Sequence, residues 1–356
     1  MDANISATVI VGVDPHKQVH AAVALDGLGV RLGVTTIPVS AKGYRDLESW
    51  ARAFGPVRAF GIEGTGSYGA GLARSLVAQG HTVVEVNRPN RQVRHQHGKS
   101  DPLDAESAAR AVLAGQATAR PKSGTSTVEM IRQTKVARDT AVKARTQAML
   151  TLKTLVVNAP AVLREQIERI AGRIALVRHL AALRPGPITT TVASTKAALR
   201  ALARRWLMLD AEIQEHDTHL DALTDAAAPT LKAAYGIATG TAAEMLILVG
   251  DNPERIRSEA AFAKLCGACP VPASSGKTIR HRLNRGGNRQ ANAALYRVVI
   301  VRLRSHPPTL AYMQRRSAEG LTKREIIRCL KRFVAREIYA QLCGPRQTAE
   351  PHPNPA

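Results

Sequence analysis

Hydrophobic residues follow two different periods along the first third of the chain. Apolar runs of five to eight residues predict five β-strands, at 8–13, 19–25, 30–37, 57–62 and 82–86. Apolar residues at helical spacing predict three helices, at 41–53, 67–79 and 101–113. Short turns join the first three strands, which predicts an antiparallel meander followed by alternating strands and helices. We therefore expect this part of the chain to form a mixed β-sheet with helices packed against it.

The pattern becomes helical over residues 126–226. Pro160 and the sequence at 184–187, Arg-Pro-Gly-Pro, interrupt it, so we expect two long helices with shorter helical pieces between them. In the second long helix, residues recur at alternating steps of three and four, with one polar member: Leu199, Leu202, Trp206, Leu209, Ile213, His216, Leu220 and Leu223. Such a heptad seam needs a facing helix. That helix lies either in the same chain, as a helical hairpin, or in a second copy, as a dimerising coiled coil.

Residues 229–343 are predicted to form a third, mostly helical and basic domain. Residues 231–250 have the form of a helix, a glycine-rich turn and a second helix, in which backbone N–H groups can face a phosphate. Between Lys277 and Arg336 the sequence has sixteen Lys and Arg residues against two acids. The expected domain bounds are 1–120, 121–228 and 229–343, followed by a disordered tail at 344–356.

The overall charge points to a polyanionic partner. The 356 residues include 50 Lys and Arg against 28 Asp and Glu, a formal net charge of +22 at pH 7. Lys and Arg gain free energy by displacing counterions from phosphates, so nucleic acid is the first candidate and an anionic membrane the second. No apolar run approaches the roughly 20 residues that span a bilayer, and the N-terminus has no secretory-leader pattern. We therefore expect a cytoplasmic protein without a membrane partner.

The four cysteines are too few for a disulfide framework in a chain of this length. Cys266 and Cys269 have the spacing of zinc ligands, but no second such pair follows, so small buried thiols are the favoured interpretation. Aromatic residues make up only 3% of the chain. Base-stacking positions are therefore few, which argues against a protein that only binds single strands by stacking.

Four carboxylates are expected to meet at one end of the predicted sheet. Asp14 follows the first strand and Glu63 the fourth, and these strands are neighbours in the ribonuclease-H-like arrangement that the order of elements predicts. Asp101 and Asp104 lie three residues apart at a helix start and so share a face. Clustered carboxylates repel one another unless a hard cation lies among them, and two Mg²⁺ ions about 4 Å apart are suited to phosphoryl transfer.

A purely structural interpretation of these acids is also open. Ser100 or Asp101 is a good N-cap, Pro102 suits the first helical turn, and acids there interact favourably with the helix dipole. Asp14 and Glu63 alone could be loop residues. The set of four in a chain depleted of acid is what favours a metal site.

Three motifs resemble, in order and spacing, the Asp-Glu-Asp-Asp motifs of the insertion-sequence transposases described as bridge-RNA-guided serine recombinases. They are "GVDPHK", "GIEGTGSYG" and "GKSDPLDAE". Residues 260–295 resemble the signature of the C-terminal transposase domain of that family, in which a serine before a glycine precedes a basic stretch and Gly-Asn-Arg. The sequence departs from the family at "CGACPVP", which replaces a Gly-Leu-x-Pro motif, and it has two serines, Ser274 and Ser275, before Gly276.

The resemblance implies an α/β plus α architecture: a RuvC-like N-terminal domain, a helical coiled-coil middle and a basic C-terminal transposase domain. It implies that Asp14, Glu63, Asp101 and Asp104 bind Mg²⁺ and that Ser275, with Ser274 as the alternative, attacks DNA to form a 5′-phosphoserine. It further implies donor and target DNA, a structured guide RNA, a homodimer or homotetramer, and a nucleoid-associated location. The candidate phosphate contacts are Lys277, Arg280, Arg282, Arg285 and Arg289.

Other functions remain as alternatives. A Holliday-junction resolvase-like nuclease of the same fold would use metal-activated water and no serine. A sugar-kinase or actin-like ATPase would need a second glycine-rich phosphate loop, which the sequence lacks. A nucleic-acid-packaging protein would bind without breaking DNA.

Overall fold

The computed structural model describes residues 8–86, 100–276 and 281–344. Internal contacts divide the chain into two compact units. The first, called here the N-terminal unit, takes its residues from Met1–Ser126 and Val249–Arg257. The second, called the helical unit, takes its residues from Thr127–Leu248 and Ser258–Ala356.

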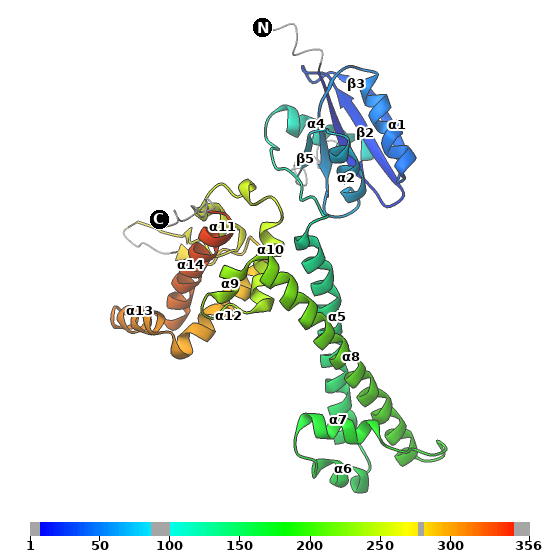
Figure 1. Ribbon diagram of the computed structural model, residues 1–356, viewed down its shortest axis with the longest axis vertical. Coiled ribbons are helices and arrows are strands. Elements are labelled where there is room, and N and C mark those ends of the chain that lie inside the picture. Colours follow the sequence, from blue (N-terminus) through cyan, green and yellow to red (C-terminus); the bar gives the residue numbers. More distant parts are fainter. Residues whose placement is uncertain (1–7, 87–99, 277–280, 345–356) are drawn as a thin grey trace, which may run out of the picture. The chain divides into compact units, whose positions relative to one another are not determined.

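The N-terminal unit contains a five-stranded mixed sheet (Figure 1). Its strands lie in the order β3-β2-β1-β4-β5. The strands are β1 (Val9–Pro15), β2 (Val19–Leu25), β3 (Arg31–Pro38), β4 (Val57–Glu63) and β5 (Val83–Val86). The first three pair antiparallel, whereas β4 is parallel to both β1 and β5. The predicted meander and the predicted neighbourhood of the first and fourth strands are both confirmed.

Helices cover both faces of this sheet because β1 alternates its side chains between two cores. On one face, Val9, Val11 and Val13 pack with residues of α1 (Ala41–Arg52) and α2 (Ala70–Ala78). On the other face, Ile10 packs with Ala105, Ala109 and Val112 of α4 (Asp101–Leu113). Because both faces of β1 are buried, its residues 9–13 are apolar throughout instead of alternating between apolar and polar.

Two glycines let α4 lie close against the sheet. A Cβ built on Gly12 of β1 would overlap the backbone oxygen of Ala105, and one on Gly61 of β4 would lie 2.7 Å from Cγ2 of Val112. Only a residue without a side chain fits either position. The helix start at Asp101 is thereby fixed relative to the end of β1.

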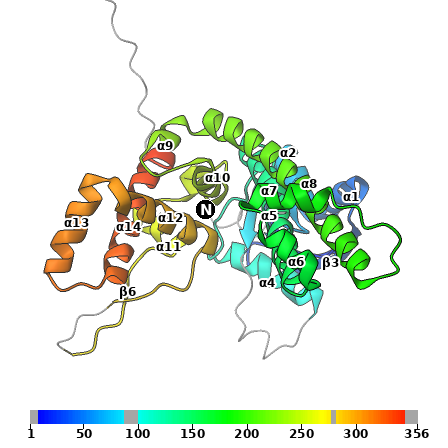
Figure 2. The same ribbon diagram turned by 90° about the horizontal axis from the view of Figure 1, so that it is seen from below.

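The helical unit is built on a long antiparallel helix pair, α5 (Thr127–Val157) and α8 (Thr191–Ala227), which lie side by side in both ribbon views (Figures 1 and 2). Ion pairs of Arg138 with Asp217 and of Arg145 with Asp210 define the antiparallel register. The seam of α8 packs on α5 of the same chain: Trp206 shares a core with Leu152. The shorter helices α6 (Ala161–Glu168) and α7 (Arg173–Ala181) lie between the two in sequence, as predicted.

The remainder of the helical unit is mostly helical. It contains α9 (Pro229–Ala233), α10 (Thr239–Val249), α11 (Glu259–Leu265), α12 (Arg289–Ser305), α13 (Pro307–Ala318) and α14 (Lys323–Leu342). The predicted turn at 231–250 is present between α9 and α10, where Gly236 has a φ of +80°. A short hairpin of β6 (Val271–Pro272) and β7 (His281–Arg282) precedes α12. In the part of the chain that the structure describes, no helix is long and apolar enough to cross a membrane.

Candidate metal centre and nucleic-acid interface

Asp14 lies at the carboxyl end of β1, at the edge where the chain turns toward β2. Its side chain is 13% exposed, and the turn that follows is closed by the His16 N–H, which donates to the Val19 oxygen at 3.0 Å. The strand brings the carboxylate to the rim of the sheet because its apolar residues are buried on both faces. Asp14 is therefore held by ordered backbone on both sides.

His16 joins Asp14 to Asp101, the first residue of α4. The Nε2 atom of His16 lies 3.2 Å from Asp14 Oδ2 and 3.3 Å from Asp101 Oδ1. One ligand atom from each of these three side chains lies within 4.8 Å of the other two. Two of the four predicted acids thus meet, together with a histidine that the sequence reasoning did not select.

Asp104 lies one turn further along α4 and is 6% exposed. Burial raises the pKa of the Asp14 carboxyl; the contact with His16 opposes this, and the negative charges of Asp104 and Asp101 raise the pKa further. Asp104 is thus close enough to act electrostatically on Asp14. Three of the four predicted acids therefore belong to one local group of charges.

Glu63 is placed on the neighbouring strand. It is the last residue of β4 and pairs with Val86 of β5, one position after the pair formed by Val13 and Ile62. This register puts Glu63 at the same end of the sheet as Asp14, as expected. The three-residue ligand group identified in the described chain does not include it.

The capping interpretation of this helix start receives partial support. Ser100 occupies the N-cap position with extended backbone angles, but its side chain makes no capping hydrogen bond. Asp101 and Asp104 do lie in the first turn, where acids interact favourably with the helix dipole. The helix dipole accounts for the two acids in the first turn of α4. It does not account for the approach of Asp14 and His16, which belong to another element, to Asp101.

The chemistry of these side chains fits a divalent cation. Carboxylate oxygens are the ligands that Mg²⁺ and Mn²⁺ prefer, and imidazole nitrogen is a common ligand of transition ions. His16 Nε2 is buried beside both carboxylates, and its single N–H can serve only one of them. A cation among the three groups would satisfy all of them. The signal for His16 in the sequence was its position, two residues after Asp14 in the same turn.

Ser275 lies in the loop of the short β6–β7 hairpin of the helical unit. It and Ser274 are exposed, and Gly276 follows with a φ of +56°, in the left-handed region that glycine adopts without strain. Lys277 and Arg280 lie outside the described residues. Of the remaining candidate phosphate contacts, Arg282 is on β7, Arg285 follows the hairpin, and Arg289 begins α12; all three are exposed.

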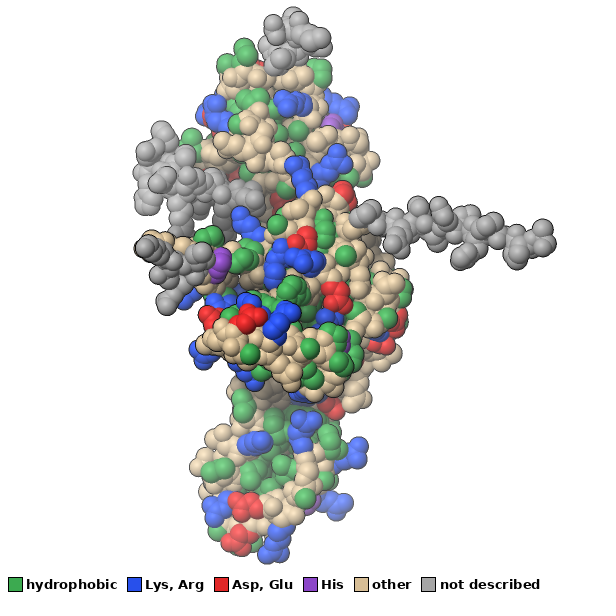
Figure 3. All heavy atoms as spheres, turned by 90° about the vertical axis from the view of Figure 1, so that its left-hand side faces the viewer, with side chains coloured by type: hydrophobic (Ala, Val, Ile, Leu, Met, Phe, Trp, Pro, Cys, Tyr) green, Lys and Arg blue, Asp and Glu red, His purple; other side chains and the backbone are tan. Residues whose placement is uncertain are grey.

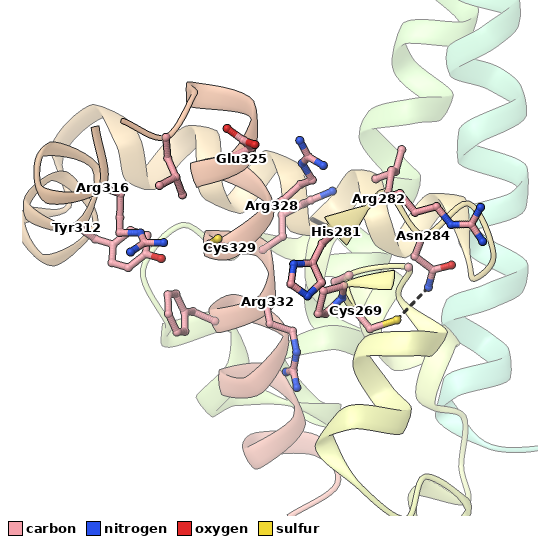
Figure 4. A pocket seen from close by; sticks show the side chains of 17 residues that line it. Cys269, His281, Arg282, Asn284, Tyr312, Arg316, Glu325, Arg328, Cys329 and Arg332 are labelled. Atoms are coloured by element: carbon pink, nitrogen blue, oxygen red, sulfur yellow. Dashed lines mark hydrogen bonds between the residues drawn. The ribbon is translucent and has the colours of Figure 1, made fainter. Parts of the chain in front are cut away.

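A basic pocket of about 770 Å³ adjoins the base of this hairpin. Figure 4 shows its lining: His281, Arg282 and Asn284 after the hairpin loop, Tyr312 and Arg316 of α13, and Arg328, Cys329 and Arg332 of α14. Glu325 is the one acid among its lining residues. The sequence reasoning selected Arg282 but missed the arginines of α13 and α14, which only the fold brings next to it.

The cations of this pocket are only partly compensated by acids. Burial and then the neighbouring Arg328 lower the pKa of Lys331, and burial and then Arg336 lower the pKa of Arg332. Within the described chain, Arg328 forms no ion pair, whereas Arg332 pairs with Glu259 and Arg316 with Glu319. A polyanion entering the pocket would relieve this repulsion. Figure 3 shows that Lys and Arg side chains are also exposed around α13 and α14, interspersed with acids.

Some of the sixteen basic residues serve the fold instead. Arg302 is 8% exposed and donates to both carboxylate oxygens of Glu337, at 2.8 and 2.9 Å. Lys331 is 6% exposed and donates to Asn292 Oδ1 at 3.0 Å. These contacts join α12 to α14, so the charge count from sequence overstates the basic surface.

The Cys266–Cys269 pair has the properties of ordinary thiols. Burial raises the pKa of Cys266 to about 12, which disfavours the thiolate that zinc would need. Cys269 Sγ accepts a hydrogen bond from Asn284 Nδ2 at 3.1 Å. Of the two thiols, Cys266 is buried, as the favoured interpretation expects, whereas Cys269 is partly exposed.

A mixed sheet with an acidic, metal-compatible edge and a separate basic helical unit are features typical of enzymes that act on nucleic-acid phosphates. The family comparisons agree with this class. A model described as "Transposase" (DEDD_Tnp_IS110) matches residues 11–159, and one described as "Transposase IS116/IS110/IS902 family" matches residues 228–314. Over these two separate parts of its sequence, the chain is therefore similar to transposases of the IS110 family.

A relative from an insertion element is also similar to this chain. The chain is 29% identical over 160 residues to the "Insertion element IS110 uncharacterized 43.6 kDa protein" of Streptomyces coelicolor (strain ATCC BAA-471 / A3(2) / M145). The alignment covers 44% of this chain and 38% of that protein. The chain thus matches well under half of the length of this relative.

Proposed function

We propose that this protein is the DNA transposase of a bacterial insertion sequence, which cuts and rejoins DNA strands at a divalent-metal site in a RuvC-like N-terminal unit. The observation that carries the proposal is the meeting of Asp14, His16 and Asp101 at the carboxyl end of β1, with Asp104 beside them. Acids from separate elements gather there in a chain of net charge +22. The family matches over residues 11–159 and 228–314 support the same conclusion.

Asp14, Asp101 and Asp104, with Glu63 from the adjacent strand, would hold Mg²⁺ or an ion of its class. When bound, such an ion lowers the pKa of a hydroxyl or stabilises a leaving oxygen at a phosphate. Asp14 is suited to this task because burial keeps its carboxylate incompletely solvated, so it gains when a cation replaces the missing solvent. The close fit of α4 on Gly12 and Gly61 holds Asp101 in place before the ligand arrives.

Ser275 is the proposed nucleophile. Its Oγ would attack a DNA phosphorus and lose its proton, forming the Oγ–P bond while the P–O3′ bond breaks and the 3′ oxygen leaves as a hydroxyl. The product is a 5′-phosphoserine, which the 3′ hydroxyl of the partner strand then attacks in the reverse sense. Ser275 is exposed on a hairpin loop, which suits a group that must reach a DNA backbone. The pocket beside the hairpin supplies cations for the flanking phosphates.

The proposed partners are donor DNA, target DNA and a structured RNA of the element that pairs with both. Basic side chains such as Arg282 and Arg328 would contact backbone phosphates, and base pairing would select the sequence. Because two duplexes must be cut, we propose a dimer or tetramer that works in the bacterial cytoplasm on nucleoid DNA.

A covalent-adduct assay tests this function. The purified full chain is incubated with labelled donor and target DNA, Mg²⁺, and RNA transcribed from the non-coding flank of its element, and the products are separated under denaturing conditions. We expect a protein–DNA adduct for the wild type and for Ser274→Ala, and none for Ser275→Ala. An adduct with Ser275→Ala but not with Ser274→Ala would reassign the nucleophile and overturn this choice of residue.

The same assay separates the alternatives. DNA cleavage without any adduct would overturn the serine mechanism in favour of a resolvase-like nuclease. Magnesium-independent binding without cleavage would overturn the enzymatic function altogether. Cleavage by Asp14→Asn at the wild-type rate would show that the carboxylates are structural.

A further inference from the structure

We propose that His16 is a metal ligand of this site, and that its nitrogen makes the centre bind Mn²⁺ more tightly than Mg²⁺. This inference rests on the proposed function, since it concerns the same centre. It adds a nitrogen donor to a site for which sequence reasoning predicted only carboxylates. It is carried by the position of His16 Nε2 between Asp14 and Asp101.

The distances agree with ligands on one ion. Neighbouring ligands of an octahedral ion with bonds of about 2.1 Å lie about 3 Å apart. His16 Nε2 lies 3.2 Å from Asp14 Oδ2 and 3.3 Å from Asp101 Oδ1. The three side chains therefore need only small adjustments to share one cation.

A protonated His16 acting as a mere counter-ion explains this geometry less well. Nε2 carries one hydrogen and faces two carboxylates at nearly equal distances, so a hydrogen bond can satisfy only one of them. The Nε2 atom is buried although the ring as a whole is 41% exposed. The Nε2 atom is thus covered by the group while other atoms of the side chain reach solvent, as a ligating histidine allows.

The fold also holds the imidazole in position. His16 follows Pro15, whose ring restricts the backbone, and its own N–H is bound to the Val19 oxygen at 3.0 Å. The three donors come from two separately ordered elements, the turn after β1 and the first turn of α4. A fixed set of carboxylate oxygens and one imidazole nitrogen favours a metal ion that binds both kinds of donor.

Ligand chemistry then sets the selectivity. Mg²⁺ prefers oxygen ligands and keeps several waters, whereas first-row transition ions accept imidazole nitrogen readily and bind mixed sites more tightly in the Irving–Williams order. We expect Mn²⁺ to bind at least tenfold more tightly than Mg²⁺. Of these two ions, Mn²⁺ is also the better probe because it is paramagnetic.

The test is pulsed electron paramagnetic resonance of the Mn²⁺-loaded full chain, with calorimetric titration of Mn²⁺ and Mg²⁺. We expect ¹⁴N modulation from a directly bound imidazole, replaced by the ¹⁵N pattern when the protein contains ¹⁵N-histidine. His16→Ala should lose the modulation and bind Mn²⁺ about tenfold more weakly, with less than a twofold change for Mg²⁺. His219→Ala, which removes an exposed histidine that contacts Glu215 at 3.8 Å, should change neither.

The outcomes separate this inference from the proposed function. Wild-type Mn²⁺ affinity in His16→Ala, or Mn²⁺ bound without ¹⁴N modulation, would overturn the role of His16. If Asp14→Asn and Asp101→Asn nevertheless abolish binding of both ions, the carboxylate centre stands. If neither substitution affects either ion, the metal centre itself is wrong.

Discussion

A Cβ on Gly12 would overlap the backbone oxygen of Ala105, so β1 and α4 are in contact without an intervening side chain. Gly12→Ala should force the two elements apart and lower stability by about 3 kcal/mol, as overpacking in a closely packed core does. Because Asp101 and Asp104 belong to α4, the same change should also weaken Mn²⁺ binding. Thermal unfolding by circular dichroism and metal titration measure the two effects.

Gly66→Ala is the matched control for this substitution. A Cβ at Gly66 would meet no atom within 4 Å, and its φ lies outside the left-handed region. We expect a change of less than about 0.5 kcal/mol in the free energy of unfolding. Equal losses in the two variants would contradict the packing argument.

Asp14→Asn should stabilise the metal-free protein at pH 7. Burial in the folded state raises the pKa of Asp14 above its ordinary value. Between about pH 4 and that raised pKa, the folded state therefore binds more protons than the unfolded state. Stability therefore falls as the pH rises through this window, and the charged carboxylate lowers stability above it. Asparagine removes this effect, and we expect a gain on the order of 1 kcal/mol in EDTA.

Added metal should reverse the order of stability of the wild type and Asp14→Asn. Mn²⁺ at saturating concentration should raise the melting temperature of the wild type, because it binds the folded state, and leave that of Asp14→Asn unchanged. A melting temperature of Asp14→Asn below that of the wild type in EDTA at pH 7 would show that Asp14 is a stabilising residue.

Glu337→Gln should destabilise the helical unit. Both terminal nitrogens of Arg302 donate hydrogen bonds to the carboxylate oxygens of Glu337, at 2.8 and 2.9 Å. The Arg302 side chain is 10% exposed, so the neutral amide would leave a buried guanidinium without its counter-charge. We expect a loss of about 2 kcal/mol, measured by thermal unfolding. Asp46→Asn breaks an exposed pair with Lys42 and should cost under about 0.5 kcal/mol. A similar small cost at Glu337 would show that the pair is solvated.

Arg328→Gln should weaken nucleic-acid binding in a salt-dependent way. Arg328 lines the basic pocket and forms no ion pair within the described chain, so it is available to a phosphate. Loss of one phosphate contact should reduce the slope of log K against log salt by about 0.9 for duplex DNA. Fluorescence anisotropy at several salt concentrations measures this slope. Arg164→Gln on α6, outside the pocket, removes the same charge and should leave the slope unchanged.

The periodic parts of the chain were predictable because their burial is regular. β1 is buried on both faces and β4 beside it is largely so, so the apolar runs at 8–13 and 57–62 marked them. The meeting of Asp14 with Asp101 followed from the order of elements and from acids at a strand end and a helix start. The facing helix of the α8 seam was not predictable, since a heptad pattern is the same within one chain or between two.

The remaining features depend on tertiary contacts that leave little trace in the sequence. His16 became a candidate ligand only once its Nε2 was found between two carboxylates. Nothing in the sequence marks Gly61 as the position on which Val112 packs against the sheet. The arginines of α13 and α14 reach Arg282 only through the fold, because they lie 34 to 50 residues after it in sequence.

The segment Val249–Arg257 belongs to the N-terminal unit although more than a hundred residues separate it from the rest. Asp251 accepts a hydrogen bond from the Ser123 N–H at 3.0 Å, and Asn252 Nδ2 donates to the Arg120 oxygen at 3.2 Å. During synthesis, the first unit therefore receives its last segment only after the whole α5–α8 hairpin has left the ribosome. A gene truncated after residue 126 would encode the acidic edge of the sheet without the segment that is hydrogen-bonded to Arg120 and Ser123.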